Sequence, residues 1–164
     1  SSGIISIGIS GLDILKNENN SIQKNIKIIK KLNFGKASIM AAVPVEFVDV
    51  NSFADLEEVS EEMRKKNQKL ICSSKYTKLA QDFFIKKNIK NFSINVSHGA
   101  TEVECKNNIS SLIVDVVQSG KTLRSNSLKI LTDSKIMDTS ACLFANKKSL
   151  KNKSVLKVLN LLTK

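Results

Sequence analysis

The sequence predicts an α/β protein with a largely parallel sheet, because apolar runs of strand length alternate with amphipathic helical stretches. The short runs are rich in β-branched residues and end at polar turns, whereas the longer stretches place their apolar residues at helical spacing. The 164 residues are 41% hydrophobic, which is enough for one sizeable core or two small lobes. A disordered chain is therefore not expected.

The expected elements follow one another along the chain with short connections. A strand at residues 4–9 leads through Ser10-Gly11 into a short helix, and residues 17–20 form a polar loop. Asn51 or Ser52 caps an amphipathic helix at residues 53–66. The other expected elements are strands at 38–43, 70–72, 92–96, 112–117 and 141–145, a helix through Leu79, Phe83 and Phe84, a short helix at 102–106 and an amphipathic helix at 150–162.

Composition narrows the function classes. The sequence contains no apolar run near the roughly 20 residues that cross a bilayer and no secretory leader, so we expect a cytoplasmic protein without a membrane partner. Cys72, Cys105 and Cys142 are odd in number and widely spaced, which predicts buried free thiols. Because His98 is the only histidine, a metal site built by the protein is not expected.

The net charge of +11 comes almost entirely from scattered lysines, since Arg64 and Arg124 are the only arginines and aromatic residues make up 5% of the chain. Nucleic-acid readout usually relies on arginine and aromatic side chains. We therefore expect solvated lysines and no nucleic-acid partner, although a small polyanionic substrate fits the charge.

A phosphate-binding loop is the most informative feature. The apolar strand at residues 112–117 carries Asp115 and then breaks into Ser119-Gly120-Lys121-Thr122. Gly120 allows close backbone approach, so amides and hydroxyls of the turn can surround a phosphate, while Asp115 suits ribose hydroxyls. The pattern predicts a ribose 5-phosphate site. A plain turn before a helix is the alternative, since the spacing is not that of a Walker loop.

The surrounding residues resemble the signature of the ATP phosphoribosyltransferase family. Asn108 stands where the family has glycine, and asparagine tolerates the left-handed backbone that such a turn requires. Similar blocks run in order from about residue 3 to residue 146, and Gln81 stands where an arginine is common. The matching signature positions are Glu102, Ser110, Ile113, Asp115, Val116, Ser119, Gly120, Thr122 and Leu123.

The resemblance implies a two-lobed fold like that of the periplasmic binding proteins, with the ligand cleft between the lobes. Residues 1–44 and 137–164 would form an incomplete first lobe, and residues 45–136 would form the second lobe, which carries the phosphate loop. Family members begin with a strand and a basic turn before the first block found here. The chain is thus expected to be an N-terminally truncated catalytic subunit of the short form, and its activity alone stays open.

The implied activity is a pentosyltransferase reaction. It transfers the phosphoribosyl group of phosphoribosyl pyrophosphate (PRPP) to ATP, giving phosphoribosyl-ATP and pyrophosphate, the first step of L-histidine biosynthesis. Mg²⁺ would accompany the pyrophosphate, and a regulatory subunit resembling histidyl-tRNA synthetase would be the partner. No dedicated catalytic side chain is implied, because positioning and electrostatics supply most of the acceleration.

The resemblance also implies roles for residues. Asp115 would hold the ribose hydroxyls, and Ser119, Gly120, Lys121 and Thr122 would bind the 5-phosphate, while Glu102 would order the loop, reach a sugar hydroxyl or start a helix. The cleft candidates are Asp13, Lys75 and Tyr76, whose structural alternatives are a helix cap for Asp13 and a lysine stem beside a packed ring. Glu104, Arg124 and His98 are expected to face solvent.

Two other classes stay open. A non-catalytic ligand-binding module could share the two-lobe architecture, but it has no need of the Asp-x-x-x-Ser-Gly-x-Thr loop. A type I phosphoribosyltransferase usually carries two adjacent carboxylates, and Val114 occupies that neighbouring place here.

Overall fold

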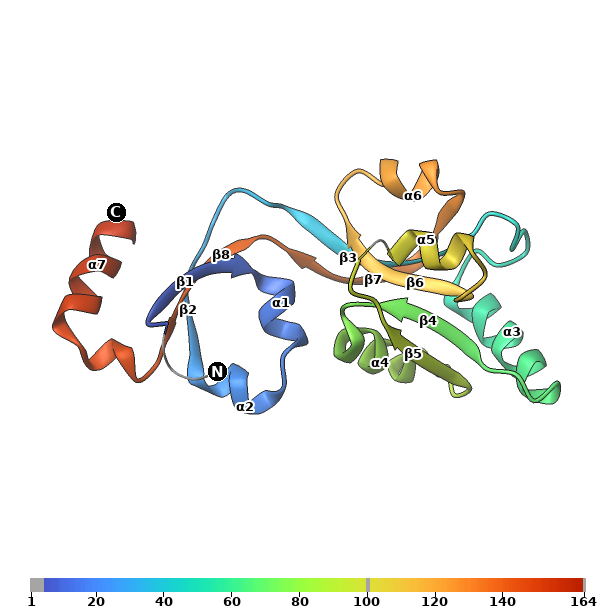
Figure 1. Cartoon of the computed structure of the whole chain (residues 1–164), viewed down its shortest axis with the longest axis horizontal. Helices are drawn as coiled ribbons and strands as arrows, with labels where there is room; N and C mark the ends of the chain where they lie inside the picture. The colour runs from blue at the N-terminus through green and yellow to red at the C-terminus, as the bar shows by residue number, and fades with distance from the viewer. Residues whose placement is uncertain (1–4, 100, 164) are drawn as a thin grey trace. The chain divides into compact units, whose positions relative to one another are not determined.

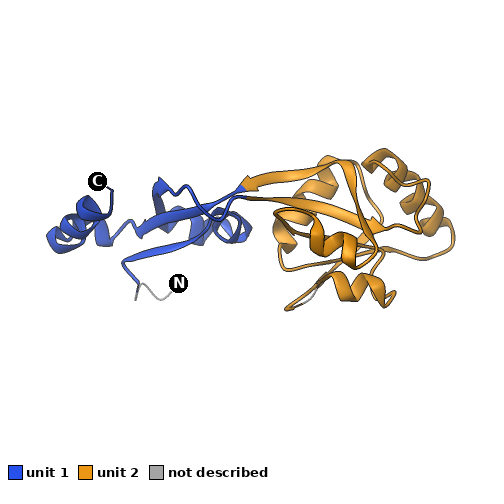
Figure 2. Cartoon of the chain, turned by 90° about the horizontal axis from the view of Figure 1, so that it is seen from above, with its two compact units in different colours: residues 1–36, 139–164 blue, residues 37–138 orange. Residues whose placement is uncertain are grey.

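The structure, a computed structural model, describes residues 5–99 and 101–163 and divides into two compact units (Figure 2). Unit 1 comprises Ser1–Lys36 and Thr139–Lys164, and unit 2 comprises Ala37–Asp138. The boundaries expected from the sequence, at 44/45 and 136/137, differ from these. The strand that ends at Pro44 lies in unit 2 because it forms part of the sheet of that unit.

Unit 1 contains a three-stranded antiparallel sheet in the order β1-β8-β2. The short helix expected after Ser10-Gly11 is present, and the expected strand at 4–9 corresponds to β1, although Ile4 lies outside the described residues. A small core of Leu143, Ala145 and Leu159 joins the sheet to the last helix. The elements are β1 (Ile7–Gly11), α1 (Leu12–Asn17), α2 (Asn20–Asn25), β2 (Ile26–Lys31), β8 (Ala141–Asn146), the 3₁₀ turn η1 (Ser149–Lys151) and α7 (Lys153–Thr163).

Unit 2 contains a five-stranded sheet in the order β5-β4-β6-β3-β7. Strand β4 runs parallel to β5 and to β6, whereas β3 runs antiparallel to β6, so the expectation of a largely parallel sheet is correct only for these three strands. The alternation of strands and helices does not reveal strand direction where the chain enters a unit. The elements are β3 (Ala37–Pro44), α3 (Phe53–Lys65), β4 (Leu70–Ser74), α4 (Thr77–Lys86), β5 (Phe92–Val96), α5 (Thr101–Lys106), β6 (Leu112–Val117), α6 (Lys121–Ser125) and β7 (Leu128–Thr139).

Helices cover both faces of this sheet, with α3 and α4 on one side and α5 and α6 on the other (Figure 1). Side chains of a strand alternate between the two faces, so neighbouring residues of β6 enter different cores. Leu112 and Val114 pack in the core that includes Phe53 and Phe84. Ile113 instead packs in the core beneath α5 and α6. Asp115, two residues further on, therefore points to the same side as Ile113.

Two helix ends in unit 2 have the capping residues that their sequences predict. The Ser52 hydroxyl and the Asp55 carboxylate form a capping box at the start of α3, which confirms the expected cap. Asn108 follows α5 with φ = 57°, which confirms the left-handed backbone predicted at this departure from the family signature. The N–H of Ile109 donates to the carbonyl of Glu104 at 2.9 Å, closing the turn that leads into β6.

Other expectations have mixed outcomes. Cys72, Cys105 and Cys142 are buried free thiols, as predicted. Within residues 5–99 and 101–163, no helix has the length and apolar character needed to span a membrane. The sequence reasoning missed α2, β2 and the long strand β7, whose buried residues do not alternate regularly along its length.

Asn108 provides a stability test of the turn before β6. Replacing Asn108 with alanine should lower the free energy of unfolding by about 1 kcal/mol relative to glycine at the same position, because a β-carbon disfavours the left-handed backbone. Urea unfolding of the two variants measures this difference. Equal stability of Asn108→Ala and Asn108→Gly would contradict the left-handed turn.

Candidate functional site

Asp115 lies on β6, next to the loop that follows the strand. It pairs with Met40 of β3, and its Oδ1 accepts a hydrogen bond from the N–H of Val116 at 2.6 Å. Burial raises the pKa of Asp115, while the N–H of Val116, the ammonium of Lys75 and the hydroxyl of Thr101 oppose the rise, and the charge of Glu102 adds to it. Lys75 and Glu102 thus both act on the Asp115 carboxyl, so the structure brings three sequence-predicted residues together.

Most of the loop after β6 is exposed to solvent, although Gly120 within it is buried. Ser119, Lys121 and Thr122 are exposed, and Gly120 is the N-cap of α6 with φ = 68°, a left-handed conformation that disfavours side chains. The first N–H groups of a helix lack intrahelical partners, so those of Lys121 and Thr122 can serve a ligand. The N–H of Lys121 donates to Ser119 Oγ at a long 3.4 Å, a weak bond that an anion can replace.

Arg124 holds this loop in shape. Its Nη2 donates to the carbonyl of Ser119 at 3.0 Å, which places a permanent positive charge against the turn. A β-carbon on Gly120 would lie 3.1 Å from Arg124 Nη1, so any side chain there would crowd the guanidinium. Arg124 is exposed, as is His98, which confirms their expected solvent-facing positions. A cavity of about 340 Å³ adjoins the loop, lined by Val45, Gly120, Leu123, Arg124, Leu128, Lys129 and Ile130.

Lys75 and Tyr76 follow β4 and have different surroundings. Tyr76 is 1% exposed, and its N–H donates to Ser74 Oγ at 2.8 Å, so the packed-ring alternative for this residue is confirmed. Lys75 is exposed, with Nζ 5.0 Å from the centre of the Tyr76 ring. Lys75 therefore remains a candidate that can present a positive charge near Asp115, whereas Tyr76 supports it from beneath.

Asp13 lies in unit 1 and is 6% exposed. Its Oδ1 accepts a hydrogen bond from the Thr139 hydroxyl at 2.6 Å, and its N–H donates to the same hydroxyl oxygen at 3.1 Å. The expected helix-cap role is wrong, because Gly11 is the N-cap of α1. The carboxylate instead joins α1 to the end of β7.

Buried hydroxyls beneath the site escaped the sequence reasoning. Ser74, Ser97 and Thr101 are at most 1% exposed, and they lie at or just beyond the ends of β4 and β5 and at the start of α5. Glu104 was expected to face solvent, but it is half-buried and accepts a hydrogen bond from Ser97 Oγ at 2.6 Å. The Ser73-Ser74 pair that closes an apolar strand was the available signal, since buried hydroxyls need partners.

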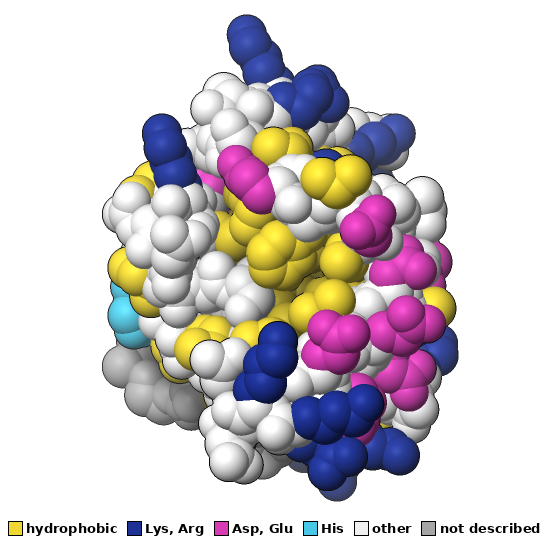
Figure 3. Space-filling view, turned by 90° about the vertical axis from the view of Figure 1, so that its right-hand side faces the viewer, with side chains coloured by type: hydrophobic (Ala, Val, Ile, Leu, Met, Phe, Trp, Pro, Cys, Tyr) yellow, Lys and Arg dark blue, Asp and Glu magenta, His cyan; other side chains and the backbone are white. Residues whose placement is uncertain are grey.

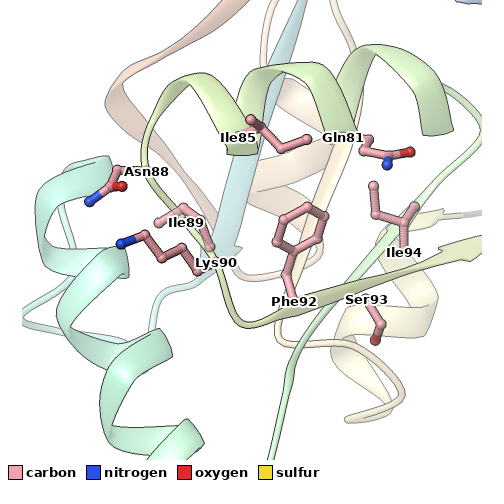
Figure 4. Close-up of a pocket in the computed structure, with 8 residues that line it drawn as sticks. All are labelled: Gln81, Ile85, Asn88, Ile89, Lys90, Phe92, Ser93 and Ile94. Atoms are coloured by element: carbon pink, nitrogen blue, oxygen red, sulfur yellow. The ribbon is translucent and has the colours of Figure 1, made fainter.

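A larger cavity in unit 2 has no carboxylate that could bind ribose hydroxyls. A cavity of about 640 Å³ lies between α4 and the edge strand β5, with Phe92 and Ile94 directed toward it (Figure 4). Gln81, which stands where the family often has arginine, lines this cavity. Its remaining lining is Ile85, Asn88, Ile89, Lys90 and Ser93, without a carboxylate. Hydrophobic side chains also gather on the end of unit 2 that carries α3 (Figure 3). Concavity alone therefore does not locate the site.

A family model for ATP phosphoribosyltransferase matches residues 1–164. The chain belongs to the ATP phosphoribosyltransferase family. An ATP phosphoribosyltransferase of Mesorhizobium japonicum is 36% identical over 149 residues, which cover 90% of this chain and 64% of that relative. An ATP phosphoribosyltransferase of Brucella anthropi is 34% identical over 158 residues, which cover 95% of this chain and 68% of the relative. The chain thus spans about two thirds of the length of these family members.

Solved structures share the fold of this ATP phosphoribosyltransferase family member. An ATP phosphoribosyl transferase (HisG:HisZ) complex from Thermotoga maritima matches with a TM-score of 0.71 and 20% identity, covering 98% of this chain and 68% of that chain. A periplasmic transporter matches with a TM-score of 0.59 and 14% identity, covering 92% of this chain and 65% of that chain. The mixed α/β fold with two sheets is thus similar to the binding-protein-like fold that the sequence resemblance implied.

Asp115 gives a test of the electrostatics of the site. Burial raises its pKa above the ordinary value of 3.8 in the folded chain, so ionisation of this carboxyl at pH 7 opposes folding. Asp115→Asn should therefore unfold at a higher temperature than the parent at pH 7. The gain should shrink as the pH falls toward 3.8, where the parent carboxyl becomes protonated in the folded chain.

Asp138→Asn is the matched control for this thermal measurement. The ammonium of Lys135 and the hydroxyl of Ser38 lower the pKa of Asp138, so loss of its charge should lower the melting temperature at pH 7. If both variants changed the melting temperature in the same direction, the conclusion that Asp115 is a desolvated carboxylate would be contradicted.

Proposed function

We propose that the chain is the catalytic subunit of a short-form ATP phosphoribosyltransferase, which transfers the phosphoribosyl group of PRPP to ATP and releases pyrophosphate. Membership of the family supports this activity. The observation that carries the proposal is the end of β6, where the half-buried Asp115 precedes a loop whose Ser119, Lys121 and Thr122 are exposed and whose buried Gly120 has φ = 68°. The product, phosphoribosyl-ATP, would enter L-histidine biosynthesis.

Each part of the loop matches a part of the sugar phosphate. The 5-phosphate would accept hydrogen bonds from the N–H groups of residues 120–122 and from the Ser119 and Thr122 hydroxyls. Arg124 would keep the Ser119 carbonyl turned away from the anion, because its guanidinium already binds that carbonyl at 3.0 Å. Asp115 would accept hydrogen bonds from the ribose hydroxyls, and Lys75 would favour its ionised form.

Glu102 extends this site at the start of α5. Its charge raises the pKa of Asp115 in addition to the larger effect of burial, which requires that the two carboxyls be near each other. A second acceptor at this place can bind another sugar hydroxyl or order the loop before α5. Glu102 is half-exposed, so either role leaves its carboxylate within reach of solvent and ligand.

The reaction needs no nucleophilic side chain. A ring nitrogen of adenine would donate its lone pair to the anomeric carbon while the bond from that carbon to the pyrophosphate oxygen breaks, and the bonding electrons leave with pyrophosphate. The transition state resembles an oxocarbenium ion beside a polyanion. Fixed groups that hold the ribose and its phosphate therefore supply positioning and electrostatic stabilisation.

We treat Mg²⁺ as part of the substrate. Among residues 5–99 and 101–163, no three histidine, cysteine, aspartate or glutamate side chains lie close enough to hold a metal ion. Mg²⁺ binds phosphate oxygens readily and keeps several waters, so it can arrive on the pyrophosphate of PRPP.

The proposed partner is a regulatory subunit resembling histidyl-tRNA synthetase. The similar fold of a HisG:HisZ complex from Thermotoga maritima supports a hetero-oligomer, although its 20% identity establishes fold alone. The enzyme is proposed to work in the cytoplasm, where ATP and PRPP are available. Domain limits near residues 44 and 137 belong to this proposal as well.

Calorimetry with PRPP and Mg²⁺ tests the proposed substrate site. The parent chain should bind, whereas Gly120→Val and Asp115→Asn should each lose at least about 100-fold in affinity. Gly120→Val blocks close approach of the phosphate to the backbone, and Asp115→Asn removes the charged acceptor for the ribose hydroxyls. Retained affinity in either variant would remove the site assignment. Binding of an amino acid or a free sugar without any response to PRPP would instead favour a non-catalytic ligand-binding module.

Gly35→Val controls for backbone strain in that titration. Gly35 also has a left-handed backbone, with φ = 65°, but it lies in unit 1 and outside the proposed loop. An equal loss of PRPP affinity in Gly35→Val and Gly120→Val would show that general destabilisation, and not the blocked phosphate loop, explains the effect.

A further inference from the structure

Buried hydroxyls connect the ends of the three parallel strands at the level of Asp115. Ser74 Oγ, at the end of β4, donates to the carbonyl of Val114 at 2.6 Å and accepts from the N–H of Tyr76 at 2.8 Å. Val114 is the residue before Asp115 on β6. Ser74 therefore fixes the backbone of β6 immediately before the carboxylate that is proposed to hold ribose.

Ser97 extends this connection to β5 and α5. Its N–H donates to the carbonyl of Ser74 at 3.1 Å, and its hydroxyl donates to Glu104 Oε1 at 2.6 Å. The Thr101 hydroxyl lies 3.3 Å from Ser97 Oγ and 3.3 Å from the carbonyl of Gly99. A chain of contacts thus runs from Glu104 through Ser97 to Thr101.

Glu104 determines which groups donate the hydrogen bonds in this series of contacts. The hydroxyls of Ser73 and Ser97 lower the pKa of Glu104, and the charge of His98 has the same effect, so Glu104 is ionised at neutral pH. An ionised carboxylate can only accept hydrogen bonds, which commits the single hydroxyl proton of Ser97 to Glu104. The oxygen of Ser97 is then left as an acceptor for Thr101.

Ser97 and Ser74 make the link to the site. Ser97 is 1% exposed and Ser74 is 0% exposed. The N–H of Ser97 donates to the carbonyl of Ser74, and Ser74 Oγ donates to the carbonyl of Val114, the residue before Asp115. The backbone position of Asp115 thus depends on Ser74 and, through Ser97, on Glu104.

We propose that Glu104 is a positioning residue for the ribose-binding carboxylate: through the buried residues Ser97 and Ser74 it fixes the place of Asp115 without touching substrate. The inference rests on the proposed function, because it concerns the sugar-binding half of the PRPP site. Glu104 does not act on the phosphate loop, which Arg124 holds separately.

Discrimination between ribose 5-phosphate and 2-deoxyribose 5-phosphate tests the inference by calorimetry. The parent should favour ribose 5-phosphate by about 10- to 100-fold, because Asp115 accepts a hydrogen bond that the deoxy sugar cannot donate. Glu104→Ala should reduce this ratio at least about fivefold, since Asp115 loses its fixed position. Glu104→Gln should keep the ratio within about twofold, because its amide oxygen still accepts from Ser97.

A merely structural role makes a different prediction. General loosening of the fold would weaken both ligands equally and leave their ratio unchanged, so an unchanged ratio in Glu104→Ala would overturn the inference. In an Asp115→Asn background, Glu104→Ala should have no further effect on the ratio, because Glu104 acts on the sugar only through Asp115. A full additional effect there would also overturn it.

Glu57→Ala is the matched control for loss of a glutamate. Glu57 lies on α3 and accepts a hydrogen bond from the Asn88 side chain, so it too uses a helix carboxylate to bind a neighbouring loop. Its loss should leave the ratio unchanged, and an effect as large as that of Glu104→Ala would contradict the specific role. A parent chain that does not bind ribose 5-phosphate would reject the proposed function itself. If the parent favours ribose 5-phosphate but Glu104→Ala leaves the ratio unchanged, only this inference is rejected.

Discussion

The parallel alignment of β4, β5 and β6 is the constraint on which the site depends. Pairing of Ser74 with Val96 and of Ser73 with Ile113 brings the carboxyl ends of the three strands to one edge of the sheet. Open α/β sheets bind ligands at this edge, where loops replace strands. On its other side β6 is paired antiparallel with β3, so Asp115 belongs to a strand that has a hydrogen-bonded neighbour on each side. The carboxylate is thus presented from rigid structure, and the phosphate loop follows directly.

The groups at this edge of the sheet fall into two sets, one buried and rigid and the other exposed. Buried hydroxyls connect the strand ends beneath the surface, while the groups proposed to meet the ligand, Ser119, Lys121 and Thr122, remain exposed. Ionisation of Asp115 opposes folding because burial raises its pKa, a cost that a binding site accepts in exchange for a strong acceptor. The excess positive charge lies mainly in unit 1, whose acidic residues are Asp13 and Glu18. A field of that sign favours the approach of polyanionic substrates.

Sequence reasoning succeeded where one local signal determined the structure. Strand β6 was placed at its observed bounds because five apolar positions surround one aspartate, and the backbone at Asn108 was predicted because few residues adopt that conformation. It failed where the answer depended on distant partners. Strand β2 alternates too weakly to distinguish it from a helix, and strand direction in the sheets cannot be inferred from periodicity. Glu104 resembled a surface residue because its partner, Ser97, belongs to another element.

The central claim is that main-chain N–H groups after β6 bind a sugar phosphate beside Asp115. Amide ¹⁵N–¹H spectra of the chain during titration with ribose 5-phosphate test it most directly, since each N–H group reports its own hydrogen bonding. We predict saturable shifts that are largest for Gly120, Lys121 and Thr122. Shifts that instead concentrate around Gln81, Ile85 and Phe92, or an unperturbed loop at saturating ligand, would contradict the account.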